Sequence, residues 1–311
     1  MMALLRISAV IIILSITGCG SGLQIIKTES QEPWSKAYVD NIGGLENISF
    51  DGQGSMFVSG FTGNVYRIEA TDNPYKGKVT GSKKLGAWCT GIEVGPDGYV
   101  YTAVTDDKHR YRIAKLDRNL ESLEWMTGYI DGMNGFTQHD GYLYYTSSNL
   151  GFFFPKGMVL RSQFALPETF KNPEVFLDNL KNVNGIKFSP DGTIFYYTDL
   201  LRGLKAYDLK TKKTSLVFGK GILSIYDDFE ITPEGDIWLC INSEGTIAFI
   251  SKGKAGKAFH IGDLKTPSAC KLGTGPGFKN NFLYVTELSL KQSSTKFDGR
   301  GVWAVPLSEL K

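Results

Sequence analysis

The sequence predicts an all-β fold, a six-bladed β-propeller with four-stranded blades. The main observation is a repeat in which a polar residue, an apolar strand and a turn glycine recur along the chain. The turn glycines are Gly54, Gly98, Gly141, Gly192 and Gly235. Their spacing of 43 to 51 residues is typical of a four-stranded blade. No long stretch has the apolar period of a helix, so a single domain is expected over residues 36–311.

Each repeat begins with two strands joined by a tight turn. The turn is an Asp-Gly, Glu-Gly or Gln-Gly pair, which is typical of a β-hairpin. The first strands start at Glu46, Thr90, Asn134, Asn184 and Asp227, and a diverged sixth repeat starts at Ser268. Second strands are expected over 56–59, 99–103, 142–146, 193–198, 237–240 and 282–287. Third strands are expected over 65–68, 113–116, 158–161, 204–207, 247–250 and 302–305.

The fourth strand of each blade is the apolar run before the next repeat, for example 125–130, 175–177 and 257–261. The sixth repeat lacks such a run, whereas residues 37–40 form a spare strand near the N-terminus. We expect the spare strand to complete the last blade. This pairing would close the ring and remove an exposed sheet edge.

Residues 1–18 are interpreted as a lipoprotein signal peptide. Arg6 supplies a positive charge, and the apolar run 7–14 is too short to span a bilayer. The segment Ile16-Thr17-Gly18-Cys19 resembles the lipobox of bacterial lipoproteins, in which the cysteine is acylated. The alternative is an ordinary secretory peptide with an incidental cysteine. Residues 19–35 would form a lipid-anchored tether to the bacterial cell envelope, on its periplasmic or extracellular face.

The charge balance argues against a nucleic-acid partner. The chain has 34 basic and 32 acidic residues, a formal net charge of +2. Neither nucleic acid nor an anionic surface is therefore expected as the main partner. Membrane contact is expected through the lipid anchor only, and the protein is expected to be a monomer. A composition that is 42% hydrophobic and 13% aromatic can fill a large core.

Three cysteines follow Cys19 in the sequence, namely Cys89, Cys240 and Cys270. Their wide spacing does not match a zinc site, and their odd number does not suggest a disulfide framework. We expect buried free thiols. A bridge between Cys240 and Cys270 is the alternative in an oxidising compartment.

The first residues of the repeats predict a central cation site. The inner strand of every blade lies beside the propeller axis, so equivalent positions form a ring at the channel mouth. The six residues that start the repeats all carry oxygen, and they include two carboxylates and two carboxamides. Such oxygens suit one divalent cation, with Ca²⁺ preferred over Mg²⁺ because it tolerates irregular geometry. The alternative is that these side chains cap backbone groups or bind channel water.

One stretch of the chain is specific enough to indicate a family. Residues 183–192, Val-Asn-Gly-Ile-Lys-Phe-Ser-Pro-Asp-Gly, and residues 195–199, Phe-Tyr-Tyr-Thr-Asp, resemble the gluconolactonase, senescence-marker-protein and luciferin-regenerating-enzyme family, with kinship to paraoxonases and strictosidine-synthase-like propellers. The resemblance implies that Glu46, Asn184 and Asp227 are metal ligands with Asn134 beside them. It also implies that Asp227 is the catalytic base.

Two departures from the family pattern stand out. Asp228 occupies a position where gluconolactonases often have Gly and paraoxonases have Asn. The paraoxonase histidine pair has no counterpart, because His109 falls in a loop, His139 in a turn and His260 in an outer strand. A mechanism driven by histidine is therefore not expected.

The predicted activity is cation-dependent hydrolysis of a lactone or ester. The cation would polarise the carbonyl while Asp227 accepts a proton from water. No G-x-S-x-G, H-E-x-x-H, P-loop or dinucleotide motif is present in the sequence. The alternative is a non-catalytic, surface-exposed binding propeller with a structural metal.

Substrate contacts are predicted at the ring and in the loops 105–111, 147–157 and 288–300 around it. The predicted substrate-binding residues are Thr90, Asp228, Ser268, Phe152, Phe153 and Phe154. The three phenylalanines favour an aryl or acyl substrate over a sugar lactone. They could equally pack the loop down or contact a partner.

Overall fold

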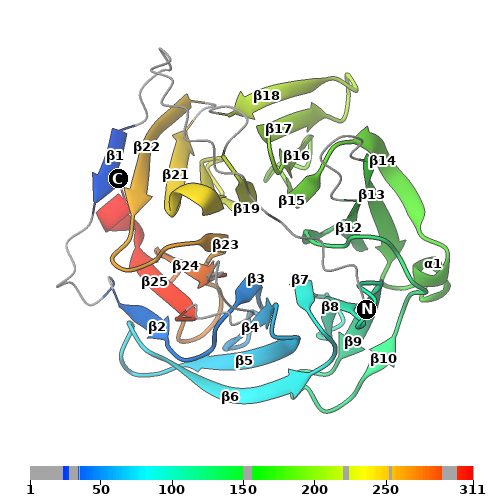
Figure 1. Cartoon of the computed structure of the whole chain (residues 1–311), viewed down its shortest axis with the longest axis horizontal. Coiled ribbons are helices and arrows are strands. Elements are labelled where there is room, and N and C mark those ends of the chain that lie inside the picture. Colours follow the sequence, from blue (N-terminus) through cyan, green and yellow to red (C-terminus); the bar gives the residue numbers. More distant parts are fainter. Residues whose placement is uncertain are drawn as a thin grey trace.

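The computed structural model describes residues 24–27, 34, 36–149, 156–219, 224–251, 254–288 and 300–310. Its strands form six sheets arranged as blades around a central axis (Figure 1), which confirms the predicted six-bladed propeller. In the described part of the chain the helical elements α1 (Glu168–Lys171), η2 (Asn242–Glu244) and η3 (Leu307–Leu310) are short. Within the described residues, no helix is sufficiently long and apolar to cross a membrane.

Each blade is an antiparallel sheet whose first strand is innermost. The first blade contains β3 (Leu45–Phe50), β4 (Ser55–Gly60), β5 (Asn64–Ala70) and β6 (Gly77–Lys84). The second contains β7 (Cys89–Val94), β8 (Val100–Thr105), β9 (Tyr111–Leu116) and β10 (Glu124–Trp125). The third contains β11 (Phe136–His139), β12 (Tyr142–Asn149), β13 (Lys156–Gln163) and β14 (Glu174–Leu180).

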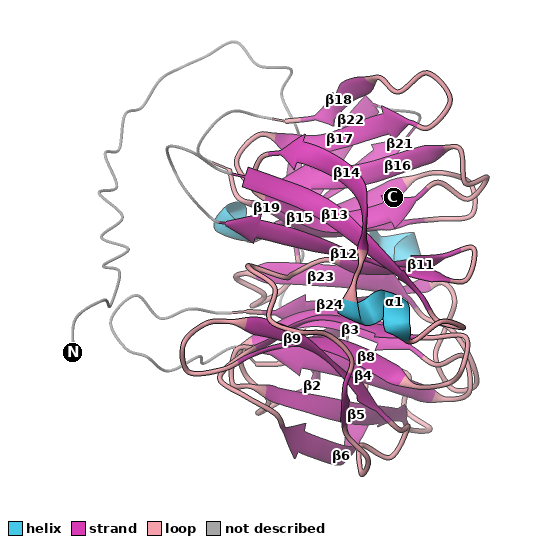
Figure 2. Ribbon diagram, turned by 90° about the vertical axis from the view of Figure 1, so that its right-hand side faces the viewer, coloured by secondary structure: helices cyan, strands magenta, loops and turns pink. Residues whose placement is uncertain are grey.

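The remaining blades follow the same order. The fourth contains β15 (Val183–Phe188), β16 (Ile194–Asp199), β17 (Gly203–Asp208) and β18 (Thr214–Phe218). The fifth contains β19 (Tyr226–Ile231), β20 (Ile237–Ile241), β21 (Thr246–Ser251) and β22 (Lys254–His260). The sixth contains β23 (Pro267–Leu272), β24 (Phe282–Glu287) and β25 (Val302–Pro306). Figure 2 shows the same blades from the side of the disc.

The ring closes as the sequence predicts. β2 (Ala37–Val39) pairs antiparallel with β25 and completes the sixth blade. In this pairing Ala37 lies opposite Trp303, and Val39 lies opposite Val302. The last blade therefore contains strands from both ends of the chain, so neither end can leave without exposing a sheet edge.

Part of the predicted tether 19–35 is structured. β1 (Gln24–Lys27) pairs parallel with β22 and adds a fifth strand to the edge of the fifth blade. Trp34 is only 7% exposed and packs in the cluster that contains Trp238. Strand β1 includes the β-branched pair Ile25 and Ile26, which suits it to pair with the otherwise free edge of β22. Cys19 and the signal peptide lie outside the described residues.

Among the described residues the apolar core forms six clusters, each between two neighbouring blades. One cluster joins Phe57 and Val65 of the first blade to Ile92 and Val104 of the second. Another joins Tyr144 and other residues of the third blade to the fourth. This packing buries the blade faces against each other and leaves the axis of the ring to polar side chains.

Two blades depart from the expected repeat. The long step between the third and fourth turn glycines contains α1, which joins β13 to β14. The fourth strand of the second blade is shorter than predicted, because Thr127 Oγ1 rather than a backbone carbonyl accepts the Ile113 N–H at 2.9 Å. A single bridge between Tyr111 and Ile130 continues the pairing.

Candidate functional site

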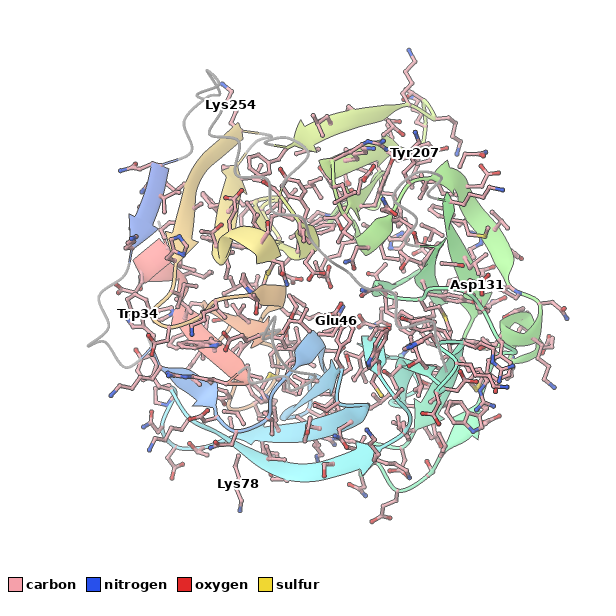
Figure 3. All side chains as sticks on the ribbon, viewed as in Figure 1. Trp34, Glu46, Lys78, Asp131, Tyr207 and Lys254 are labelled. Atoms are coloured by element: carbon pink, nitrogen blue, oxygen red, sulfur yellow. The ribbon has the colours of Figure 1, made fainter. Side chains whose placement is uncertain are left out.

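The six residues predicted for the central ring lie at the same end of the inner strands. Figure 3 places Glu46 near the centre of the ring. Five of them are in inner strands: Glu46 in β3, Thr90 in β7, Asn184 in β15, Asp227 in β19 and Ser268 in β23. Asn134 lies two residues before β11. Asn134 is half-buried, and the other five are buried. The ring is therefore a set of polar groups that have been withdrawn from water.

The local backbone explains how these side chains reach the axis. Five inner strands shift register against their second strands next to the ring residue. In β3 the shift falls between Leu45 and Asn47, which flank Glu46. In β19 it falls between Tyr226 and Phe229, which flank Asp227 and Asp228. An irregularity of this kind changes the direction of a side chain, which would otherwise point to alternate faces of the sheet like its neighbours in the strand.

Glycine follows the asparagines of the ring because neighbouring strands approach closely there. A Cβ atom at Gly135 would lie 2.1 Å from the Asn184 backbone oxygen. A Cβ atom at Gly185 would lie 2.5 Å from Asp228 Oδ1. These distances are too short for any side chain, so the Asn-Gly pairs of the sequence repeat keep the ring narrow.

Amide side chains hold the two carboxylates of the ring. Asn134 Nδ2 donates a hydrogen bond of 2.8 Å to Glu46 Oε1. Asn184 Nδ2 donates one of 2.8 Å to Asp227 Oδ1, and Asn242 Nδ2 donates one of 3.3 Å to Asp227 Oδ2. Because each NH₂ group faces a carboxylate, the amide oxygens of Asn134 and Asn184 remain available for another partner.

Three buried oxygens of the ring have no hydrogen-bond partner among the described residues: Glu46 Oε2, Asn134 Oδ1 and Asn184 Oδ1. All three are acceptors, and a buried acceptor without a donor is costly. Carboxylate and amide oxygens are also the ligands that Ca²⁺ prefers. The residues present therefore fit a hard divalent cation.

Many of the oxygen atoms that could bind a cation belong to amide side chains. Within the described part of the chain, no group of three or more His, Cys, Asp or Glu side chains is arranged to hold a metal ion. A cation at the axis would thus take about half of its protein oxygens from Asn134 and Asn184, which leaves Glu46 and Asp227 to match its charge.

The two carboxylates resist ionisation. Burial raises the pKa of Glu46 to about 7; the hydrogen bond from Asn134 opposes this shift and the negative charge of Asp228 adds to it. Burial, together with repulsion from Glu46 and Asp228, raises the pKa of Asp227 well above its ordinary value. A cation between these groups would stabilise their charged forms.

Asp228 is already bonded through both oxygens. It accepts a hydrogen bond from Asn47 Nδ2 at 3.0 Å and another from the Phe229 backbone N–H at 2.8 Å. Burial raises the pKa of Asp228, whereas the nearby Lys187 and Lys271 lower it. Its main effect on the ring is therefore electrostatic, through the pKa values of Glu46 and Asp227.

A second charged level lies three residues farther along the inner strands. Lys187 Nζ is 3.3 Å from Glu230 Oε2, and Lys271 Nζ is 3.2 Å from Glu93 Oε2. These two ion pairs place two ammonium groups and two carboxylates at the level next to the ring.

Comparison with known proteins identifies the family. Residues 63–289 match the SMP-30/Gluconolactonase/LRE-like region. This protein belongs to the SMP-30/gluconolactonase/LRE-like family. The family resemblance expected from the sequence is thereby confirmed.

Members and structural neighbours of the family share the fold at low identity. A luciferin-regenerating enzyme superposes with a TM-score of 0.65 at 17% identity, covering 87% of this chain and 95% of that one. Regucalcin from Agrobacterium tumefaciens, described as a calcium-binding protein, superposes with a TM-score of 0.63 at 13% identity, covering 91% and 95%.

A curated relative is the cell growth-regulated gene 1 protein of Candida albicans. It is 30% identical to this family member over 156 residues. The match covers 46% of this chain and 45% of the relative, so the chain spans less than half the length of that protein.

The other predicted ring residues link blades. Thr90 Oγ1 donates a hydrogen bond to the Met133 carbonyl at 2.8 Å, and Ser268 Oγ donates one to the Leu45 carbonyl at 2.8 Å. Each bond joins the inner strand of one blade to the chain that enters the next.

A substrate contact by Thr90, Asp228 or Ser268 remains a prediction. Phe152, Phe153 and Phe154 lie outside the described residues.

The structure adds site residues that the sequence did not indicate. Asn242 lies in η2 after a second strand, where no repeat position marks it. Asn47 follows Glu46 as Asp228 follows Asp227, so the repeat alignment contained a signal for it. Burial, with the negative charge of Glu46, raises the pKa of Tyr111, which puts this phenol near the ring.

Two histidines pack against aromatic rings, and the described cysteines are buried. The His109 ring lies 4.5 Å from the Trp88 ring, and the His139 ring lies 4.1 Å from the Phe188 ring. His260 ends the outer strand β22, as predicted. The three cysteines after Cys19 are buried and free, which confirms the preferred prediction.

Proposed function

We propose that this protein is a Ca²⁺-dependent hydrolase of lactones or esters. The observation that carries the proposal is the group of three unpartnered buried oxygens, on Glu46, Asn134 and Asn184, beside the Asp227 carboxylate. Membership of a family whose description includes gluconolactonase supports lactone hydrolysis. The calcium binding ascribed to regucalcin supports the choice of cation.

Glu46, Asn134, Asn184 and Asp227 would hold the cation through their oxygens. When bound, Ca²⁺ supplies a Lewis acid that polarises the substrate carbonyl and favours negative charge on its oxygen. The amide hydrogen bonds fix the orientation of both carboxylates before substrate arrives. Such preorganisation avoids rearrangement of the site during the reaction.

Asp227 is the proposed general base. Asn184 and Asn242 hold its two oxygens, so the carboxylate cannot rotate away from an attacking water. Burial raises the pKa of Asp227, and because a bound cation would oppose this shift, the carboxylate would stay ionised and able to accept a proton. Protonation of Asp227 also removes one negative charge from beside Glu46 and Asp228, which offsets part of the cost of proton transfer.

Aromatic side chains at the same end of the blades favour an aryl or acyl substrate. The Trp88 ring lies 5.1 Å from Phe61 and 4.5 Å from His109, and these residues occupy loops on the ring face. Tyr111 contributes a phenol near Glu46. Together with the predicted contribution of residues 152–154, they would supply an apolar entrance to the site.

The same proposal covers location and partners. Acylation of Cys19 would hold the protein at the bacterial cell envelope, on the periplasmic or extracellular face, as a monomer. The partner is a small lactone or ester rather than nucleic acid, in keeping with the net charge of +2.

A substrate panel tests the proposal. The purified protein is assayed with γ- and δ-lactones and with aryl esters, in Ca²⁺ and after treatment with EDTA. We expect Ca²⁺-dependent turnover that Asp227→Asn lowers by about 10² to 10⁴. Asp72→Asn, at an exposed aspartate in a loop, is the matched control and should retain full activity.

Two outcomes would contradict the proposal. Turnover by Asp227→Asn near the wild-type rate would exclude Asp227 as the base. Tight Ca²⁺ binding without turnover of any lactone or ester would instead favour the non-catalytic binding propeller.

A further inference from the structure

Cys240 and Cys270 lie in neighbouring blades, on β20 of the fifth and β23 of the sixth. Cys240 belongs to the apolar cluster between these two blades, whereas Leu239, the residue before it, belongs to the cluster between the fourth and fifth. Cys270 belongs to the same cluster as Cys240, whereas Ala269, the residue before it, packs towards the first blade. The two thiol side chains therefore point into one interface from opposite sides.

The two cysteines also lie at the same height along their strands. Cys240 is two residues before Asn242, whose side chain donates to the ring residue Asp227. Cys270 is two residues after the ring residue Ser268. Because side chains two residues apart in a strand share a face, each cysteine is one step below the level of the ring.

Contacts bring the two side chains together. Cys270 Sγ donates a hydrogen bond of 3.2 Å to the backbone carbonyl of Trp238, which is two residues from Cys240 on β20. Burial, followed by a hydrogen bond with Cys270, raises the pKa of the Cys240 thiol well above its ordinary value. Cys89 lies apart, in the cluster between the first and second blades. Among the described cysteines, Cys240 and Cys270 are thus the neighbouring pair.

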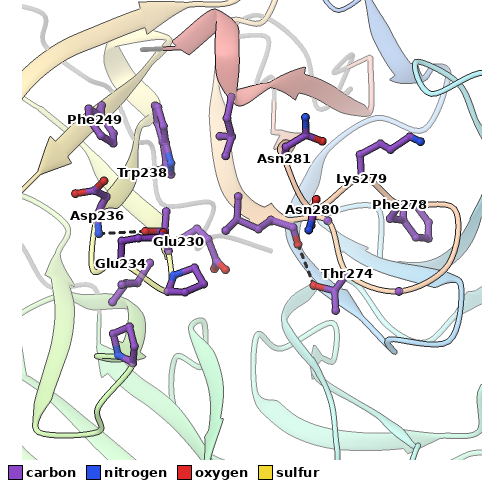
Figure 4. Close-up of a pocket in the computed structure, with 18 of the residues that line it drawn as sticks. Glu230, Glu234, Asp236, Trp238, Phe249, Thr274, Phe278, Lys279, Asn280 and Asn281 are labelled. Atoms are coloured by element: carbon purple, nitrogen blue, oxygen red, sulfur yellow. Dashed lines mark hydrogen bonds between the residues drawn. The ribbon is translucent and has the colours of Figure 1, made fainter.

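A cavity of about 1230 Å³ approaches this pair from the end of the inner strands opposite the ring, between the turns 232–236 and 273–281 (Figure 4). Trp238, labelled in Figure 4, and Leu272 line the cavity, and each is two residues from one of the cysteines. The cysteines themselves are no more than 1% exposed. An oxidant therefore reaches the thiols before the two blades pack together, or when their interface opens.

We propose that Cys240 and Cys270 form a disulfide that joins the fifth and sixth blades when the chain folds under oxidising conditions. Both are free thiols in the structure, so the disulfide is a second, oxidised form of the same pair. Nothing in this inference depends on the proposed hydrolase activity. The envelope location proposed from Cys19 would supply a compartment in which disulfides persist.

The oxidant is a small disulfide such as glutathione disulfide, and the chemistry is thiol–disulfide exchange. One protein thiolate attacks a sulfur of glutathione disulfide, which forms a mixed disulfide and releases one glutathione thiolate. The second protein thiolate then attacks the protein sulfur of the mixed disulfide and releases the other glutathione. The two protein thiols lose two protons and two electrons, and the glutathione disulfide gains them as two thiols.

The cross-link would close the loop 240–270, which includes the two outer strands of the fifth blade. A cross-link of this kind limits the unfolded chain and so favours the folded state. It would also fix β20, which leads to Asn242, against β23, which begins next to Ser268. The fifth and sixth blades would therefore be held together directly below the ring.

Refolding of the urea-unfolded chain in reduced glutathione or in glutathione disulfide tests the proposal. The chain carries Cys19→Ser, which removes the thiol that is expected to be acylated in the cell. After alkylation with N-ethylmaleimide, we expect peptide mass spectrometry of the oxidised sample to show a link between Cys240 and Cys270, with Cys89 alkylated. The oxidised protein should melt about 4 to 16 °C above the reduced protein.

Cys89→Ala is the matched control, because it removes a buried cysteine that has no cysteine beside it. This variant should keep the rise in melting temperature on oxidation, whereas Cys240→Ala and Cys270→Ala should each lose it. The proposal would be overturned by the absence of the link after oxidative refolding, by a link that involves Cys89, or by equal melting of the oxidised and reduced proteins. The mass measurement needs no substitution at either cysteine of the pair, so it does not depend on how well those variants fold.

Discussion

Glycine at the second position of a repeat sets how closely the inner strands pack. In Gly135→Ala the new methyl group would lie 2.1 Å from the Asn184 carbonyl oxygen, so the strand must move. We expect a loss of about 1 to 3 kcal/mol in the free energy of unfolding, and a weaker Ca²⁺ response because Asn134 and Asn184 are displaced. Urea unfolding measures the loss.

Gly128→Ala is the matched control for this substitution. A Cβ atom at Gly128 would meet nothing within 4 Å, and its backbone is not in the left-handed region. Its stability should stay near that of the wild type. Equal stability of Gly135→Ala and Gly128→Ala would show that the strands can separate without cost.

The unpartnered oxygens of the ring lead to a second prediction. A cation that binds only the folded state stabilises it, by about 2.7 kcal/mol at 100 times its Kd. Ala at Glu46, Asn134 or Asn184 should therefore reduce the rise in melting temperature that Ca²⁺ produces. Differential scanning calorimetry with and without Ca²⁺ measures this rise.

Thr90→Val is the control for the ligand substitutions. Its hydroxyl donates to the Met133 carbonyl and not to the unpartnered oxygens, so the variant should lose stability yet keep the Ca²⁺-induced rise. If Thr90→Val lost the rise as fully as Asn184→Ala, the oxygens assigned as ligands would be the wrong set.

At the scale of single residues, the sequence indicates which polar side chains form the ring but not which partners they bind. Repeat alignment brings Glu46, Asn184 and Asp227 to one ring because equivalent positions share one end of the inner strands. Asn242 could not be found this way, since it belongs to a turn after a second strand. Thr90 fits the alignment, but its hydroxyl donates to the Met133 backbone carbonyl, a contact between blades that the repeat alignment does not indicate.

The N-terminal strands give a prediction at the scale of elements. A chain starting at residue 28 lacks β1, one starting at 36 also lacks Trp34, and one starting at 41 lacks β2. We expect a small loss of stability for the first truncation and a further loss of about 3 to 5 kcal/mol with Trp34. The third should lose most, because the last blade loses a strand.

Thermal melts of the three truncations check this order. Trp34→Ala in the full chain separates the effect of the side chain from that of chain length. Equal melting temperatures for the chains that start at 36 and 41 would mean that β2 does not close the ring.

The loop between β8 and β9 should respond to acid. Asp106 accepts hydrogen bonds from the Lys108 N–H at 2.9 Å and the Arg110 N–H at 3.0 Å. These bonds, led by that from Arg110, lower the pKa of Asp106 to about 2 from 3.8. Because the pKa is lowered, the loop is fully stabilised above about pH 4 and loses this contribution as the pH falls from 3.8 towards 2.

NMR titration of the Lys108 and Arg110 amides measures the midpoint of this change. Asp106→Asn keeps the side-chain size and should remove the pH dependence. A midpoint near 3.8 would show that the hydrogen bonds of the loop do not form in solution.

The elements themselves follow from the sequence where turn and alternation agree. The hairpins around Gly98 and Gly192 lie where the Asp-Gly turns predict them. The end of the fourth strand in the second blade was harder to predict. There the side-chain hydroxyl of Thr127, rather than a backbone carbonyl, accepts the hydrogen bond from the Ile113 N–H. β1 was also missed, because its stability comes from the edge of β22, more than 200 residues away in the sequence.

The whole molecule places different chemistry on its two faces. The ring of Glu46, Asn134, Asn184 and Asp227 lies at one end of the inner strands, and the cavity with Trp238 lies at the other. The ion pairs of Lys187 with Glu230 and Lys271 with Glu93 lie between these levels along the inner strands, and Glu230 also lines the cavity.

The lipid anchor provides the prediction that concerns the whole molecule. If Cys19 is acylated, the protein expressed in a bacterium should incorporate labelled palmitate and remain with the membrane fraction, because more than one acyl chain gives stable anchoring. Cys19→Ser should lose the label and appear in the soluble fraction or stay unprocessed, while Ser21→Ala, two residues away, should behave as the wild type. The proposed site residues begin at Glu46, so we expect Ca²⁺-dependent turnover by the purified Cys19→Ser protein to equal that of the wild type. Retention of Cys19→Ser in the membrane at wild-type level would mean that something other than this thiol holds the protein there.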